Sequence, residues 1–181
     1  MNVKQAIVNY ARAGYAGLYV SSHEETRVEA EVKSAAETLG YHLAWWSCTV
    51  GITLIEDGEA KVIPETDNPE SMAATFATLP ERTMLLARDL HPFLDNPILV
   101  RRLKDGIAAG RATNRVLVVC GCKLVIPPEL EKVITPIEFS LPTRDELREV
   151  LVGSYRSAEM EPPSKEDVVE SILDAASGLT T

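Results

Sequence analysis

Short, continuous apolar runs alternate along this chain with longer segments whose apolar residues recur every three to four positions. Runs that are apolar throughout are typical of strands buried on both faces, and connections of helical length join parallel strands. The sequence therefore predicts an α/β fold: a five-stranded, mostly parallel sheet with helices on both faces. The expected strands are residues 18–21, 42–50, 83–87, 115–120 and 134–139.

Asparagine, twice followed by proline, precedes three of the helical segments, as is typical of helix starts. The expected helices are residues 3–13, 24–39, a segment from 68, 96–110, 143–155 and 164–178, with a short helical turn at 127–132. Residues Ile52–Ile63 alternate around Glu56-Asp57-Gly58, which predicts a β-hairpin inserted after the second strand. Pro136 favours an edge position for the last strand.

The charge balance limits the partners of this chain. It has 18 Lys and Arg against 27 Asp and Glu, a net charge of −9. Nucleic acid and anionic membranes are disfavoured, because polyanion affinity needs surplus positive charge. The sequence has no apolar run near the roughly 20 residues that span a bilayer, and no apolar leader at its start. Cys48, Cys120 and Cys122 lie in or beside apolar strands, so we expect reduced core cysteines in a cytoplasmic protein.

Ligands of such sheets bind at the carboxyl ends of the strands. Those ends are residues 21–25, 48–52, 88–91 and 121–123. A nucleotide-binding chain would carry a glycine-rich loop at the first end, but no Gly-x-x-x-x-Gly-Lys-[Ser/Thr] occurs here. One interpretation is a degenerate anion pocket. We favour a capping box of Ser22 with Glu25, because carboxylates at the positive end of a helix would repel phosphate.

The segment Arg88-Asp89-Leu90-His91 follows the third strand. Asp89 and His91 could form a catalytic pair, since histidine titrates near neutral pH. No motif supplies a nucleophile, so we favour a turn in which Asp89 pairs with Arg88 or a backbone donor. Trp45 and Trp46 are adjacent in a strand and should face opposite sides, at least one of them in the core.

A concentration of positive charge lies on the helix expected at 96–110 and just after it. On a helix, Arg101 and Lys104 share a face and Arg102 lies to one side. A solvated face is the default interpretation, and a subunit contact is the alternative. The candidate interaction surface consists of Arg101, Arg102, Lys104 and Arg111, with Arg115 nearby.

Three stretches of the sequence carry a resemblance to a known family. Residues 126–147 contain Pro-Pro-Glu-Leu before the last strand and Leu-Pro-Thr-Arg-Asp-Glu after it; residues 89–94 and 175–180 also match. The chain resembles the N-terminal half of the uncharacterised AAA ATPases of cyanobacteria, chloroplasts and some phages, in which an AAA-like domain without a phosphate loop precedes a complete AAA domain. The resemblance implies a P-loop-NTPase (AAA) like domain lacking Walker A over residues 1–160, and the start of a truncated helical lid over residues 161–181.

The departures from the family pattern lie at three strand ends. The phosphate-loop position is occupied by Ser21, Ser22, His23, Glu24, Glu25 and Thr26. The magnesium-holding acid falls on Arg88, which cannot bind a cation, Asp89 takes the place of the catalytic acid, and the sensor position is Cys120-Gly121-Cys122. Because the phosphate-loop lysine and hydroxyl are missing, we expect no cofactor and no metal in this segment, with ATP and magnesium possible in a parent protein.

These features favour a catalytically degenerate AAA-like module. Its expected partners are an AAA ATPase domain, expected in the same parent chain, or other copies of itself. Its expected role is assembly or recognition of a partner or substrate. One alternative is an ATP-hydrolysing AAA ATPase whose active site lies in a C-terminal domain outside this sequence. A further alternative is an α/β module that binds a small molecule other than a nucleotide, using the strand ends at Ser21, Cys48, Asp89 and Cys120.

Overall fold

The computed structural model describes residues 2–56, 58–139, 144–158, 160–161, 163 and 165–176. The chain divides into two compact units, Met1–Phe139 and Ser140–Thr181. The sequence-based boundary, after residue 160, places helix α5 (Arg144–Ser157) in the first domain, whereas in the structure α5 packs on α6 (Glu166–Ala176). The first unit therefore ends with its last strand.

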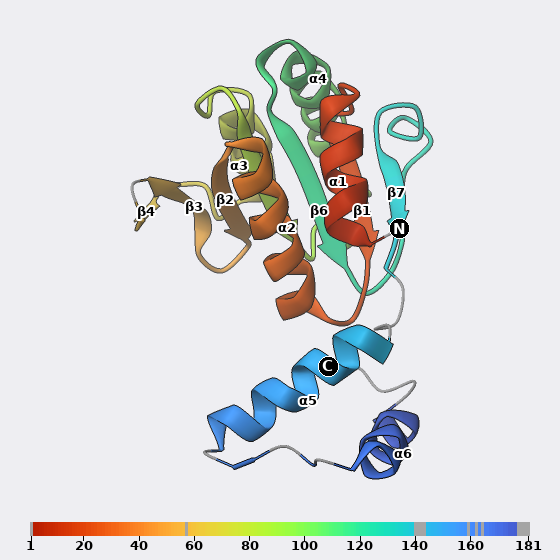
Figure 1. The fold of residues 1–181 in the computed structure, drawn as a ribbon. Coiled ribbons are helices and arrows are strands. Elements are labelled where there is room, and N and C mark those ends of the chain that lie inside the picture. The colour runs from red at the N-terminus through yellow and green to blue at the C-terminus, as the bar shows by residue number, and fades with distance from the viewer. Residues whose placement is uncertain are drawn as a thin grey trace. The chain divides into compact units, whose positions relative to one another are not determined.

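The first unit is built around a mixed sheet (Figure 1). Among the described residues this sheet has seven strands, in the order β4-β3-β2-β5-β6-β1-β7. The strands are β1 (Gly17–Ser21), β2 (His42–Ser47), β3 (Gly51–Glu56), β4 (Glu59–Val62), β5 (Thr83–Arg88), β6 (Val116–Gly121) and β7 (Thr135–Glu138). Five of them pair in parallel, as predicted. The predicted hairpin, β3 and β4, continues the sheet antiparallel to β2 and widens it from five strands to seven. Pro136 lies in the edge strand β7, as expected.

The second parallel strand is shorter than predicted. β2 ends at Ser47, and residues 48–50 form a turn in which the Val50 N–H donates to the Ser47 carbonyl at 3.3 Å. Gly51 then has a φ of 88°, in the left-handed region that favours glycine. A Cβ at Gly51 would lie 2.6 Å from Thr66 Oγ1, so this position needs glycine for space as well.

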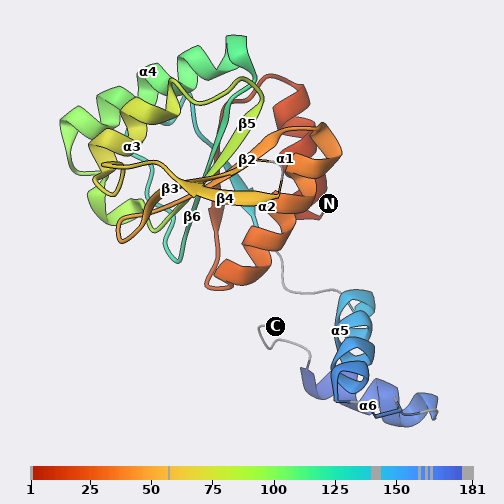
Figure 2. The same cartoon turned by 90° about the vertical axis from the view of Figure 1, so that its left-hand side faces the viewer.

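Helices cover both faces of the sheet, as predicted (Figure 2). α1 (Val3–Arg12) and α2 (Glu25–Leu39) pack on one face, and α3 (Pro69–Phe76) and α4 (Pro97–Thr113) pack on the other. The Asn68 and Asn96 side chains accept hydrogen bonds from first-turn N–H groups, which confirms both caps. α4 continues past its predicted end near Gly110, and Asn114 ends it in the left-handed conformation (φ 54°). Residues 127–132 form hydrogen-bonded turns.

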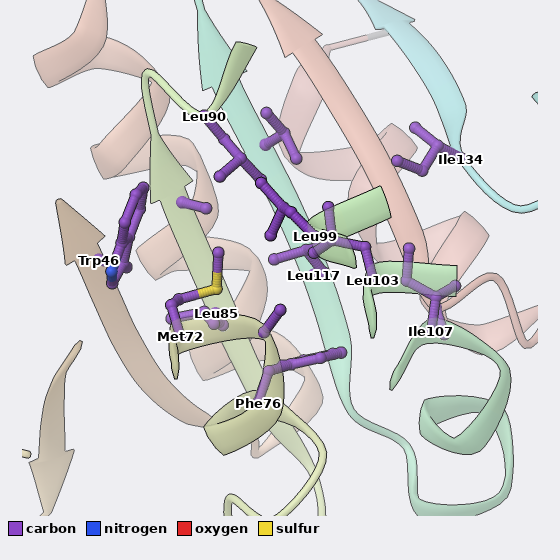
Figure 3. Packing of buried hydrophobic residues seen from close by; sticks show 14 of the residues in the cluster. Trp46, Met72, Phe76, Leu85, Leu90, Leu99, Leu103, Ile107, Leu117 and Ile134 are labelled. Carbon is purple, nitrogen blue, oxygen red and sulfur yellow. The ribbon is translucent and has the colours of Figure 1, made fainter. Parts of the chain in front are cut away.

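Alternate residues of the central strands point into two separate cores. One core, facing α3 and α4, contains Tyr19, Ala44, Trp46, Leu85 and Leu117; the other, facing α1 and α2, contains Leu18, Leu43, Met84 and Val118. Figure 3 shows Trp46 and Leu85 beside Met72 of α3 in the first of them. Trp45 is half-buried against the opposite core. The two adjacent tryptophans thus face opposite sides, which confirms that prediction.

The second unit is a pair of helices. α5 and α6 are held together by an Arg144–Glu170 ion pair at 2.6 Å and by buried apolar residues, namely Leu147, Val169 and Leu173. The predicted caps at Thr143 and Ser164, and the predicted helix end near Gly178, lie outside the described residues. Among the helices that the structure describes, none combines the length and the apolar character needed to cross a membrane.

Candidate functional site

The parallel strands bring their carboxyl ends to one edge of the sheet, where ligands of such folds bind. Backbone hydrogen bonds extend the ladder beyond the strands: Ser22 N–H donates to the Gly121 carbonyl at 3.0 Å, and Asp89 N–H donates to the Cys120 carbonyl at 2.8 Å. The edge therefore gathers three of the predicted segments, around Ser22, Asp89 and Gly121. The fourth, residues 48–52, follows β2 at the same edge, next to the end of β5, because these two strands pair in parallel with Trp46 opposite Ala87.

The start of α2 differs from the predicted capping box. The helix begins at Glu25, and its N-cap is Glu24, whose side chain makes no capping hydrogen bond. Ser22 Oγ accepts instead from the Glu24 N–H at 2.9 Å, which closes a turn ahead of the helix. The prediction was wrong because it placed the first helical residue too early. Glu25 is the first residue of the helix, whereas in a capping box the acid is the third helical residue, three positions after the N-cap.

Arg88 lies among the carboxylates of α2. Its NH1 is 2.8 Å from Glu29 Oε1 and 3.5 Å from Glu25 Oε1. Glu24 forms a further pair with Arg27 at 3.5 Å. Sequence reasoning favours a turn in which Asp89 pairs with Arg88 or a backbone donor, but the arginine pairs elsewhere. The alternation of the strand explains the difference: Ala87 faces the α3–α4 core, so Arg88 faces α2.

This arrangement does not fit a magnesium nucleotide. The turn that would hold phosphate is bordered by three carboxylates, Glu24, Glu25 and Glu29, and the nearby Arg88 is already paired with two of them. Phosphate binding needs positive potential and free N–H groups at a helix start, whereas acids at that end repel it. Within the described part of the chain, no group of three or more His, Cys, Asp or Glu side chains is placed to hold a metal ion.

Asp89, His91 and Cys122 form a second cluster at the same edge of the sheet, separate from the ion pairs of Arg88. Asp89 has a φ of 47°, unusual for a residue other than glycine, and its Oδ1 lies 3.8 Å from His91 Nδ1. His91 Nε2 lies 4.0 Å from Cys122 Sγ. A Cβ on Gly121 would lie 2.7 Å from Nδ1, so glycine is what admits the imidazole ring. Sequence reasoning considered an Asp–His pair but favoured a turn, and it missed the cysteine, because no motif links positions that far apart.

The three cysteines differ in their surroundings. Cys120 is buried as expected, and burial, followed by the charge of Glu25, raises the pKa of its thiol to about 12. Cys48 and Cys122 are exposed, which corrects the expectation that they lie in the core. Both follow the last residue of a strand, where the chain leaves the covered part of the sheet. Tyr19, near Cys122, donates from its hydroxyl to the Lys123 carbonyl at 2.6 Å, and burial raises the pKa of that phenol.

The basic residues of the predicted surface on α4 have different surroundings. Arg101 pairs with Asp105 of its own helix at 2.6 Å, and Arg102 donates to the Glu70 carbonyl of α3 at 3.0 Å. Lys104 borders a groove of about 340 Å³ between the first half of α4 and the loop after β6. The groove is lined by Leu94, Asp95, Pro97, Val100, Arg101, Lys104, Pro127 and Glu129. Arg111 is exposed further along the helix, about two turns beyond Lys104 on the same face.

A family model described as the SpoVK-like AAA ATPase, N-terminal domain, matches residues 3–139 of this chain. The chain is also 25% identical over 170 residues to the uncharacterised AAA domain-containing protein ycf46 of Guillardia theta, covering 93% of this chain and 33% of that protein. Identity to the protein of the same description from Trieres chinensis is 25%, over 99% of this chain and 36% of the relative. The chain thus spans about a third of the length of these curated relatives.

Solved structures share the fold at low sequence identity. A DNA replication initiation factor superposes with a TM-score of 0.57 at 10% identity, covering 94% of this chain and 54% of that one. A single-residue variant of RuvB from Thermotoga maritima superposes with a TM-score of 0.55 at 16% identity, covering 88% of this chain and 51% of that one. The replication initiator DnaA, bound to AMPPCP and single-stranded DNA, superposes with a TM-score of 0.54 at 11% identity, covering 93% of this chain and 54% of that one. These likenesses establish an AAA-type, P-loop-NTPase-like fold.

Proposed function

Because the chain belongs to the family of SpoVK-like AAA ATPase N-terminal domains, we propose that it is a catalytically degenerate AAA module whose role is assembly. It docks on an ATP-hydrolysing AAA domain of the same parent protein, or on further copies of itself, and recognises a partner or substrate for that ATPase. ATP and magnesium act in the parent protein, outside this segment. The length of the relatives, about three times the matched region, is in keeping with a further domain there.

The observation that carries the proposal is the position of Arg88. An AAA site needs an acid there to hold magnesium, and this chain has an arginine that forms ion pairs with Glu25 and Glu29 of α2. The ion pairs occupy the side of the turn where phosphate would need positive charge. Catalysis of phosphoryl transfer consists almost entirely of positioning and of charge stabilisation, and the residues at this turn supply neither.

We expect this chain not to bind ATP in the presence of magnesium. A ligand at about 100 times its Kd stabilises a folded protein by about 2.7 kcal/mol, so even modest binding would raise the melting temperature measurably. Titration calorimetry and thermal unfolding with ATP, ADP and magnesium are expected to give no saturable heat and no shift, with an ATP-binding AAA domain as the positive control. Saturable binding at micromolar concentration would overturn the degenerate assignment.

Assembly is expected to use the face of α4 that carries Lys104 and Arg111. In sedimentation velocity across a wide concentration range, the chain should associate with itself or with the AAA domain of its parent protein. Lys104→Glu should weaken that association by about 1 kcal/mol, or roughly fivefold, since it reverses a charge at the rim of the groove. Lys61→Glu, on the exposed edge strand β4, is the matched control and should have no effect. A chain that stays monomeric and binds no AAA domain would contradict the assembly role.

A further inference from the structure

Cys122, His91 and Asp89 have the geometry of a thiol with a base and an orienting acid. The order of the three groups is linear: Cys122 Sγ is 4.0 Å from His91 Nε2, and His91 Nδ1 is 3.8 Å from Asp89 Oδ1. With the proton of the neutral ring on Nδ1, the ring nitrogen paired with the Asp89 carboxylate at 3.8 Å, Nε2 is left to accept the thiol proton. This is the arrangement that activates cysteine nucleophiles.

Packing restricts the imidazole to this orientation. His91 Nδ1 is buried and has no hydrogen-bond partner. The Asp89 carboxylate, at ion-pair distance, offsets part of the cost of burying this polar atom. The ring lies over Gly121, where any Cβ would come within 2.7 Å of Nδ1. His91 itself begins a short 3₁₀ turn, His91–Phe93, that follows β5. The Tyr19 phenol is a further ionisable group beside the cluster, since the charges of Cys122 and Asp89 both act on it.

Exposure distinguishes this thiol from Cys120. Cys122 is exposed and can meet a reagent from solvent, whereas Cys120, in β6, is buried. Cys48 is exposed as well and follows β2, so the chain carries its own reference thiol. The thiolate rather than the thiol is the nucleophile, and a neighbouring base increases the fraction that reacts at neutral pH.

We infer that Cys122, with His91 as its proton acceptor, is a site of thiol–disulfide exchange with small-molecule disulfides. The inference rests on the geometry of this cluster and is independent of the proposed assembly role. The exposed thiol provides access, His91 provides the base, and Asp89 stabilises the imidazolium that forms.

The exchange conserves atoms and electrons. The Cys122 thiol gives its proton to His91 Nε2, and the thiolate attacks one sulfur of the disulfide. A new S–S bond forms to Cys122 while the original S–S bond breaks, and its electron pair leaves on the other half of the reagent. That thiolate takes the proton back from His91 and departs as a thiol. Cys122 is oxidised to a mixed disulfide, and one half of the small molecule is reduced.

The test compares rates of mixed-disulfide formation with oxidised glutathione at Cys122 and Cys48, followed by peptide mass spectrometry. At pH 7 we expect Cys122 to react about tenfold faster than Cys48. The ratio should fall toward one above about pH 9, where solvent base deprotonates ordinary thiols. A thiol that is merely more accessible would keep its advantage at every pH.

Two variants and one control assign the effect to the imidazole. His91→Gln should bring the ratio at pH 7 close to one, and His42→Gln, on the exposed first residue of β2, should leave it unchanged. Gly121→Ala keeps the imidazole but displaces the ring, so it should also lower the ratio, and it serves if His91→Gln does not fold. Equal rates at both thiols in the unmodified chain, or a ratio that survives in His91→Gln, would overturn the inference.

Discussion

Replacing Trp46 with alanine is expected to lower the free energy of unfolding by about 3–5 kcal/mol. Trp46 is fully buried in the core between the sheet and the α3–α4 layer, and its ring meets that of Phe93 edge to face at 6.5 Å between centroids. Its Nε1 donates to the Thr66 carbonyl at 2.6 Å. The substitution therefore opens a large cavity and leaves a buried acceptor without its donor. Urea unfolding followed by circular dichroism measures the loss.

Trp45→Ala is the matched control for this prediction. Trp45 precedes Trp46 on the same strand but is only half-buried, against the opposite core. Its removal should cost clearly less, because a half-buried ring withdraws less apolar area from water on folding. Equal losses for the two variants would contradict the assignment of Trp46 as the larger contributor to the core.

Raising the pH from 9 to 12 is expected to destabilise the fold through Cys120. Burial raises the pKa of this thiol from 9.0 to about 12. Below pH 9 the thiol is protonated in both the folded and the unfolded states, so the contribution is fully present. Above pH 9 the unfolded chain loses the proton while the folded chain keeps it, so stability falls until the pH passes the folded pKa. The expected loss is a few kcal/mol by about pH 12.

Comparison with Cys120→Ala separates this effect from the other groups that titrate in alkali. Burial also raises the pKa of Tyr19, so this phenol too lowers the stability of the fold as the pH rises. Both proteins contain Tyr19, so its effect cancels in the comparison. The variant should be less stable than the unmodified chain at about pH 8, because it loses buried apolar contacts, and should close the gap as the pH rises. Cys48→Ala, at an exposed thiol, should leave the pH dependence unchanged. Parallel stability curves for the unmodified chain and Cys120→Ala would contradict the prediction.

Local patterns predicted most elements of the fold. The apolar runs located the parallel strands, and the asparagine caps at Asn68 and Asn96 located two helix starts. These predictions succeeded because periodicity and capping depend on residues within one turn or one strand. The errors were local too: the end of β2 at Ser47 depends on the left-handed Gly51, and the start of α2 at Glu25 depends on the turn closed by Ser22.

The candidate site was predicted only in part. Its location followed from the strand ends, and the missing phosphate loop was visible in the sequence. The partners of its side chains were not, because Arg88 meets Glu29 across 59 positions and Cys122 meets His91 across 31. No periodic pattern encodes contacts between segments so far apart in the chain.

The sequence by itself determined that this chain is an α/β domain without a phosphate loop. The alternation of buried strands with helices leaves few other ways to cover the apolar surface, and a missing motif is a property of the sequence alone. The tertiary structure decided what occupies the strand ends instead. The register of β5 against β6, and of β6 against β1, sets Arg88 toward the acids of α2 and brings His91 over Gly121 beside Cys122. Register arises from packing of the whole sheet, so these neighbours appear only once the strands are assembled.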